Sequence, residues 1–159
     1  MDTNLELWTH CKKCIDGCCY RGVPLVTSAE RERIIAEHPD HFEPFGNNFV
    51  TPKPNGYCPY LELDTGRCSI HEVKPVDCQI YPLDPFYNGE NIEFVVDTPC
   101  PASRHLTPEF INAAMSLAQK WIKLFPRPEF EDYFERYKKS NPRQELRKLD
   151  ELFDEKIIK

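Results

Sequence analysis

Cysteine placement is the feature that most constrains what this chain can fold into. All eight cysteines of the 159 residues lie within the first hundred positions, and four of them stand within nine consecutive residues. Thiolates are the ligands that zinc, cuprous copper and iron in clusters prefer, and short loops let several thiols reach one centre. The pattern therefore predicts a metal site. Its candidate ligands are Cys11, Cys14, Cys18, Cys19, Cys58, Cys68, Cys78 and Cys100.

The N-terminal run holds the densest group of thiols. Cys11 and Cys14 have the two-residue spacing found in zinc knuckles and in iron–sulfur loops. Cys18 and Cys19 are adjacent, so both can bind one centre only if the backbone bends sharply, which Gly17 would permit. We therefore expect this run to form one wall of a larger thiolate cage.

The next three thiols follow at equal intervals, at positions 58, 68 and 78, each beside a turn signal. Leu61 and Leu63 alternate before Asp64-Thr65-Gly66, which predicts a hairpin that brings Cys58 and Cys68 together. Cys78 lies in a stretch whose two flanking prolines restrict the backbone.

A second hairpin is predicted around Asn88-Gly89, with a return strand that would deliver Cys100 toward the other thiols. Ten of the fifteen prolines lie between Pro39 and Pro101, so regular structure in that stretch must be short. We expect a metal to organise this region.

These motifs, in this order, resemble a family of zinc- or iron-chelating domains named for a Cys-x-x-Cys-x-x-Cys-Cys signature. The resemblance covers about residues 8–83, and two positions depart from the pattern. Three residues rather than two separate Cys14 from Cys18, and Lys74 stands where the family usually carries arginine. The matching positions are Cys11, Cys14, Cys18, Cys19, Cys58, Leu61, Gly66, Cys68, Ile70, Pro75, Cys78 and Pro82.

The resemblance implies metal binding and assigns no reaction. A related cysteine box in flagellin lysine methylases is similar to an iron–sulfur site, which brings in a third hypothesis, a component of a protein-modifying enzyme. No independent catalytic motif is present, so the sequence predicts no catalytic residues.

Disulfides are the main alternative to metal thiolates, because the number of cysteines is even. Cysteine makes up about 5% of the chain, below the roughly 8–10% of short disulfide scaffolds. The first residues show no signal peptide, and we expect a cytoplasmic protein. Metal thiolates are favoured, although two or three cysteines would fit as ordinary buried residues.

The choice of metal rests on spacing. Structural zinc commonly uses two separated Cys-x-x-Cys pairs, whereas this chain has one such pair and then isolated thiols. An iron–sulfur cluster, of the 4Fe-4S type, is therefore favoured over zinc. His10, His71 and His105 lie near cysteines, and a surface or outer-shell role is favoured for each of them over ligation.

The expected fold class is α+β. We expect a metal-organised, Pro- and Cys-rich half with short hairpins (1–105), packed against about three C-terminal helices (106–159) in one compact domain. A capping box at Thr27-Ser28-Ala29-Glu30 predicts a helix through about His38. Apolar residues at helical spacing predict a helix from Pro108 to Phe125, a second around Phe130 and a third after Pro142.

The net charge and the predicted metal site limit the partners and the functions that we expect. A net charge of -6 and no apolar run of membrane-spanning length argue against nucleic acid and membrane partners. The C-terminal helices are the candidate surface for a protein partner, and the oligomeric state stays open. The leading hypothesis is an iron–sulfur protein with a redox or sensing role. The alternative is a zinc-stabilised protein-interaction module.

Overall fold

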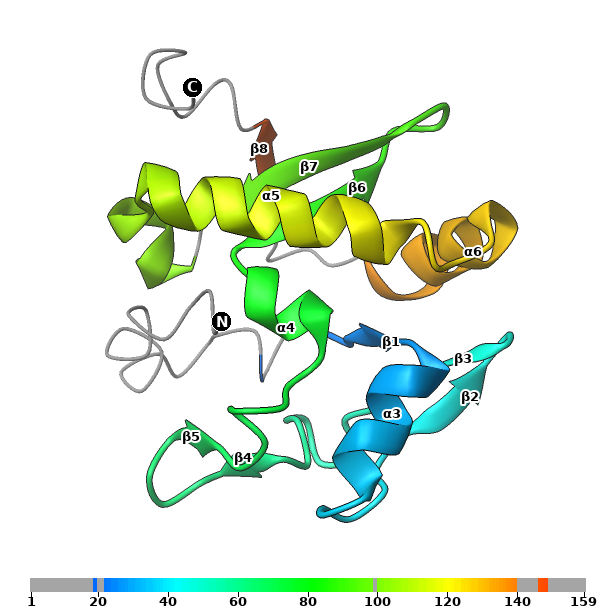
Figure 1. Cartoon of the computed structure of the whole chain (residues 1–159), viewed down its shortest axis with the longest axis vertical. Coiled ribbons are helices and arrows are strands. Elements are labelled where there is room, and N and C mark those ends of the chain that lie inside the picture. The colour runs from blue at the N-terminus through cyan, green and yellow to red at the C-terminus, as the bar shows by residue number, and fades with distance from the viewer. Residues whose placement is uncertain (1–18, 20–21, 99, 140–145, 149–159) are drawn as a thin grey trace.

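The computed structural model combines short strands with helices, so the predicted α+β class is confirmed (Figure 1). It describes residues 19, 22–98, 100–139 and 146–148. Its elements, in chain order, are β1 (Leu25–Val26), α3 (Ser28–Ile35), β2 (Glu43–Phe45), β3 (Asn48–Val50), β4 (Leu61–Glu62), β5 (Arg67–Cys68), α4 (Val76–Ile80), β6 (Leu83–Tyr87), β7 (Ile92–Asp97), the 3-10 helix η2 (Pro101–His105), α5 (Pro108–Ile122), α6 (Arg127–Tyr137) and β8 (Leu146–Lys148).

Residues 25–50 form a small sheet with a helix beside it. Strand β3 lies between β1 and β2 and is antiparallel to both, with Leu25 opposite Val50 in one pair. The predicted capping box is present in α3, where the Thr27 side chain accepts from the Glu30 amide and Glu30 accepts from the Thr27 amide. The helix ends at Ile35, three residues before the predicted end.

The predicted hairpins are both confirmed. Strands β4 and β5 pair antiparallel, and Gly66 between them has a φ of 71°, a left-handed conformation that glycine adopts without strain. Strands β6 and β7 pair over five residues around the Asn88-Gly89 turn. Between the two hairpins lies α4, a five-residue helix that the proline-based prediction did not include.

The third predicted C-terminal helix is wrong for residues 146–148. These residues form β8, which pairs antiparallel with β7 and completes a three-stranded sheet in the order β6-β7-β8. The exposed edge of β7 offers backbone donors and acceptors, and Leu146 to Lys148 satisfy them instead of bonding within a helix. The last eleven residues of the predicted helix lie outside the described part of the chain.

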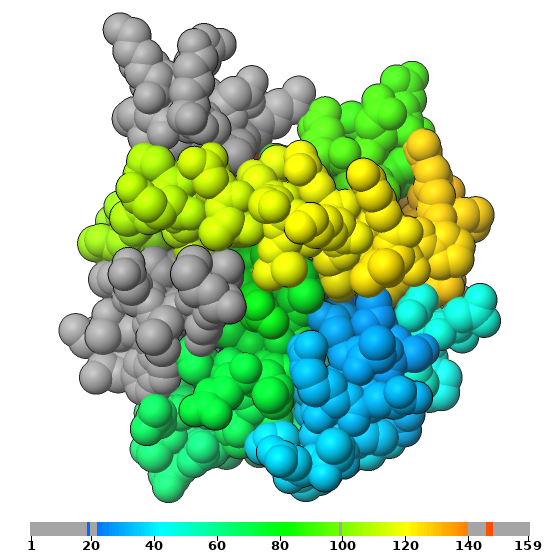
Figure 2. Space-filling view, in the orientation of Figure 1, coloured from blue at the N-terminus to red at the C-terminus, as the bar shows by residue number. Residues whose placement is uncertain are grey.

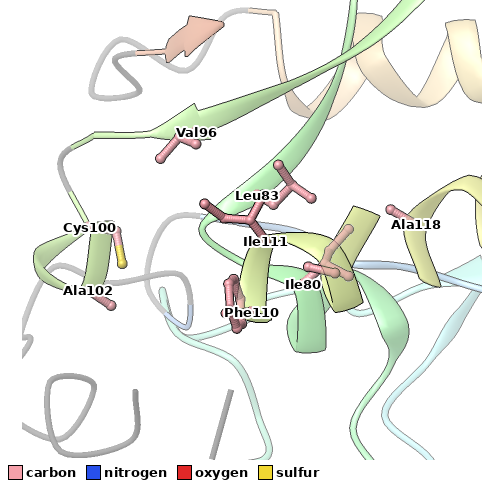
Figure 3. Close-up of a cluster of buried hydrophobic side chains, with 9 residues drawn as sticks. Ile80, Leu83, Val96, Cys100, Ala102, Phe110, Ile111 and Ala118 are labelled. Atoms are coloured by element: carbon pink, nitrogen blue, oxygen red, sulfur yellow. The ribbon is translucent and has the colours of Figure 1, made fainter. Parts of the chain in front are cut away.

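The two long helices form as predicted. Thr107 caps α5 through the Phe110 amide, with Pro108 at the first position, and α6 spans the predicted aromatic positions. In the space-filling view α5 crosses the molecule between the β6–β7 hairpin and α3 (Figure 2). Its apolar face contributes Phe110, Ile111, Ala114 and Ala118 to a core that also holds residues of α4, β6 and β7 (Figure 3).

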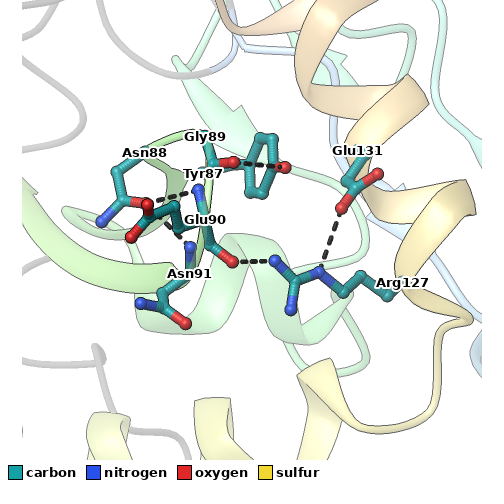
Figure 4. Close-up of polar contacts among 7 residues, drawn as sticks. All are labelled: Tyr87, Asn88, Gly89, Glu90, Asn91, Arg127 and Glu131. Carbon is teal, nitrogen blue, oxygen red and sulfur yellow. Dashed lines mark hydrogen bonds and ion pairs between the residues drawn. The ribbon is translucent and has the colours of Figure 1, made fainter.

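Helix α6 is tied to the tip of the β6–β7 hairpin. The Arg127 guanidinium donates to the backbone carbonyl of Glu90 and, at 3.0 Å, to Glu131 one helical turn away (Figure 4). The Asn88 side chain accepts from the amides of Glu90 and Asn91 and so shapes the turn that presents this carbonyl.

Gly46 is the contact point between α6 and the β2–β3 turn. Its φ is 58°, and a Cβ at this position would lie 2.6 Å from Cδ of Glu129. The Glu129 carboxylate accepts from the Asn48 side chain at 2.7 Å and from the Asn47 amide at 3.3 Å. A side chain at position 46 would therefore both strain the backbone and displace this carboxylate.

We expect Gly46→Ala to lower the free energy of unfolding by about 2 kcal/mol, of which about 1 kcal/mol is the left-handed backbone conformation. Gly56→Ala is the matched control, because its φ is 84° and nothing lies within 4 Å of its Cβ position. Urea unfolding of both variants measures the difference. Equal losses would show that the Glu129 contact adds nothing.

No helix in the residues that the structure describes is both long and apolar enough to cross a lipid bilayer.

Candidate metal centre

The β4–β5 hairpin carries two of the candidate ligands. Cys68 pairs with Leu61 across the strands, and the Leu61 amide donates to the Cys58 carbonyl at 3.0 Å. Both thiols are half-buried and pack against a small cluster of Ile34, Tyr60 and Ile70. The predicted hairpin therefore places Cys58 and Cys68 beside the same cluster of buried side chains.

The N-terminal cysteine run is joined to this hairpin through Cys19. The Cys58 amide donates to the Cys19 carbonyl at 2.7 Å, across 39 positions of sequence. Cys19 is half-buried. The other thiols of the run, Cys11, Cys14 and Cys18, lie outside the described residues, so their predicted ligation stays a prediction.

Cys78 comes from helix α4 and is half-buried. Its amide donates to the carbonyl of Pro75, the residue before the helix, at 2.9 Å, and the Gln79 amide donates to the same carbonyl at 3.0 Å. The two residues after Cys78 hold the helix in place: the Gln79 side chain donates to the Lys74 carbonyl, and Ile80 is fully buried in the core. The helix thus presents Cys78 from a fixed backbone.

Asp77, directly before Cys78, is a buried structural anchor rather than a turn residue. Its carboxylate accepts from the Leu25 amide at 2.9 Å and lies 3.3 Å from the Tyr133 hydroxyl. Burial raises the pKa of Asp77 to about 6, against the opposing effect of Lys138. Asp77 therefore connects α4 to β1, which comes much earlier in the chain, and to α6, which comes much later.

The histidines differ in their surroundings. His71 follows Cys68 in a turn, donating its amide to the Cys68 carbonyl, and its Nδ1 lies 3.4 Å from Nζ of the buried Lys74. His105 is exposed at the end of η2, and His10 lies outside the described part. The Lys74 ammonium thus lies against Nδ1, one of the two ring nitrogens of His71, and the outer-shell role expected for His71 stays a prediction.

Cys100 lies in apolar surroundings. Its residue is 8% exposed and packs with Ile80, Leu83 and Ile111 in the core beneath α5. Figure 3 shows it beside Ala102 at one end of this cluster. The β6–β7 hairpin does lead the chain to Cys100, as predicted, but it delivers the residue into the hydrophobic core.

The described thiols do not complete a site by themselves. In the part of the chain that the structure covers, no three His, Cys, Asp or Glu side chains gather closely enough to hold a metal ion. The donor chemistry is nonetheless of one kind, because Cys19, Cys58, Cys68 and Cys78 are all half-buried thiols near backbone turns. Such donors fit zinc or an iron–sulfur cluster and do not fit magnesium or calcium.

Sequence reasoning missed the buried charges around α4. Asp84 is 2% exposed and forms an ion pair with Lys138 of the α6 C-terminus. Burial opposes the charge of Lys138, but Asp84 and Asp77 outweigh it and raise the pKa of the Lys138 ammonium. An aspartate within the apolar run Leu83-Asp84-Pro85-Phe86 is the signal that could have revealed this pair.

Comparison with protein families supports the reading from the cysteines. Residues 10–101, more than half of the chain, match the family model CxxCxxCC, described as "Putative zinc- or iron-chelating domain". The matched stretch contains every cysteine of the sequence. The chain matches no curated protein and no solved structure. By its cysteine pattern and this match, the chain belongs to the CxxCxxCC family of zinc- or iron-chelating domains.

Proposed function

We propose that this chain holds an iron–sulfur cluster, of the 4Fe-4S type, in a cage of cysteine thiolates and uses it for electron transfer or oxidant sensing. The observation that carries the proposal is the 2.7 Å hydrogen bond from the Cys58 amide to the Cys19 carbonyl. It supports the proposal because it holds the backbone of Cys19, the last cysteine of the N-terminal run, against the backbone of Cys58, which is 39 positions away in sequence.

The ligands would come from three segments. The N-terminal run supplies Cys11, Cys14 and Cys18 or Cys19, the hairpin supplies Cys58 and Cys68, and α4 supplies Cys78. An inorganic cluster tolerates such irregular spacing because its own iron–sulfur core sets the distances between ligands. A 4Fe-4S cluster takes four of these thiols, one on each iron, and a single zinc ion would also take four. Either centre leaves other thiols of the set available for redox chemistry.

Cys100 is the member of the predicted ligand set that we assign to the core. We expect Cys100→Ala to leave the metal content unchanged and to lower the free energy of unfolding by about 1 kcal/mol, because the substitution removes one buried sulfur atom. Metal analysis together with urea unfolding measures both quantities. A loss of metal in a variant that remains folded would restore Cys100 to the ligand set.

Anaerobic purification of the full-length chain tests the proposal. Visible absorbance, iron, acid-labile sulfide and zinc are measured on the same sample. We expect a brown protein with equal amounts of iron and sulfide, whose absorbance bleaches on reduction with dithionite and recovers on reoxidation. A colourless protein with stoichiometric zinc would overturn the cluster and support the zinc-stabilised interaction module instead.

A further inference from the structure

Glu30 is a buried carboxylate that forms hydrogen bonds to two separate elements. The residue is 6% exposed, and Oε2 accepts from the Thr27 amide at 2.8 Å and from the Thr27 hydroxyl at 3.0 Å. Oε1 accepts from the Val76 amide at 2.7 Å, across 46 positions of sequence. A buried charge is costly unless it is fully hydrogen-bonded, so each of these contacts has a structural consequence.

The hydrogen bond from the Val76 amide to Glu30 supplies an N-terminal capping contact that α4 does not receive from the residue before it. Val76 is the first residue of α4, and the residue before it, Pro75, makes no side-chain capping hydrogen bond. The first amides of a helix have no partner within the helix, and a five-residue helix is too short to be stable without tertiary contacts. Glu30 therefore acts as the N-cap of α4 from another helix.

This cap determines how Cys78 is presented. Successive residues of a helix are rotated by about 100°, so Asp77 and Ile80 lie on neighbouring sides of α4 and Cys78 lies on a different one. Asp77 is bonded to Leu25, and Ile80 is fully buried. With Glu30 holding Val76, the first, second and last residues of the helix are fixed, and the direction of the Cys78 side chain is fixed with them.

We propose that Glu30 is a positioning residue of the metal centre, which aims the Cys78 thiol through the hydrogen bond to Val76. The inference rests on the proposed function, since it takes Cys78 as a metal ligand. Residues that orient a ligand without touching the metal commonly change metal affinity by about 10- to 100-fold when they are replaced.

The capping box of α3 provides the matched control. Thr27→Ala removes the hydroxyl that accepts from the Glu30 amide and donates to Glu30 Oε2, and so weakens the cap of α3. The bonds that Glu30 accepts from the Thr27 and Val76 amides remain. Glu30→Ala removes both the side-chain contacts to Thr27 in the capping box of α3 and the acceptor for the Val76 amide of α4. Glu30→Gln is the milder variant, because an amide keeps one oxygen and can accept on only one of the two sides.

The experiment follows metal release from the metal-loaded, full-length chain into excess chromophoric chelator, with iron and zinc both quantified. The thiolate-to-metal absorption and circular dichroism of each variant are recorded before chelator is added. We expect Glu30→Ala to release metal at least about tenfold faster than wild type, with altered thiolate-to-metal bands, and Thr27→Ala to stay within about twofold with unchanged bands. Glu30→Gln is expected to fall between them, and it decides the matter if Glu30→Ala does not fold.

Two results would overturn the positioning role. Equal release rates for the Glu30 and Thr27 variants would reduce Glu30 to a cap of α3, and release at the wild-type rate would remove it from the site. Failure of the proposed function can be told apart from failure of the positioning role, because metal binding is measured on the wild-type chain and positioning on the variants. A wild-type protein that holds no metal would overturn the thiolate cage, and the positioning role with it.

Discussion

Cys68→Ala is expected to lose most of its bound metal and to unfold more easily by about 3 kcal/mol. That figure is about a quarter of the 10–16 kcal/mol with which four ligands hold a structural zinc ion. The local structure offers little compensation, because β4 and β5 have two residues each and, among the described residues, the hairpin packs on a cluster of three buried side chains. Metal analysis and thermal unfolding of the purified variant measure the two effects.

Ser69→Ala is the matched control for this substitution. Ser69 adjoins Cys68, is exposed, and bonds to Tyr60 through its backbone amide, which alanine keeps. We expect wild-type metal content and a stability change below about 0.5 kcal/mol. A Cys68→Ala variant with full metal content and the melting temperature of Ser69→Ala would show that Cys68 is no ligand.

Lys138→Met is expected to lower the free energy of unfolding by about 3–5 kcal/mol. Methionine retains much of the apolar stem but removes the cation that forms the ion pair with Asp84 and interacts electrostatically with Asp77. Both aspartates are buried, with 2% and 7% of their surface exposed, so water cannot replace the lost partner. Removing one partner of a buried ion pair costs about this amount.

The neighbouring lysine separates this effect from a general loss of charge. Lys139 pairs with Glu135 at 3.2 Å, but its side chain is 62% exposed. Exposed pairs of this kind contribute about 0.3–0.5 kcal/mol. We therefore expect Lys139→Met to unfold almost as the wild type does in urea. Equal destabilisation by the two substitutions would contradict the buried network.

The parts of the fold that the sequence predicted are those with strong local signals. Thr27 and Glu30 define a capping box, Asn88-Gly89 defines a hairpin, and Thr107-Pro108 starts a helix, and each signal acts within a few residues. Strands β1 to β3 have two or three residues each, too few for an alternating pattern to emerge. Leu146 was assigned to a helix because helical spacing cannot reveal an unpaired edge on β7.

The candidate site also has features that the sequence predicts and features that it does not. Spacing predicts which thiols are candidate ligands, because metal chemistry restricts the residue types that can serve as ligands. It did not distinguish Cys100, which packs in the core, from the half-buried Cys58, Cys68 and Cys78. It also missed the second hydrogen bond of Glu30, since a contact over 46 positions depends on how α3 and α4 pack together.

X-ray absorption at the iron and zinc edges of the full-length, anaerobically purified chain tests the thiolate cage most directly. The measurement counts the atoms around the metal and gives their distances without requiring a crystal. Thiolate ligation predicts a shell of sulfur at about 2.3 Å, with an additional iron–iron shell if a cluster is present. A bound metal surrounded only by nitrogen and oxygen at about 2.0–2.2 Å would contradict the account.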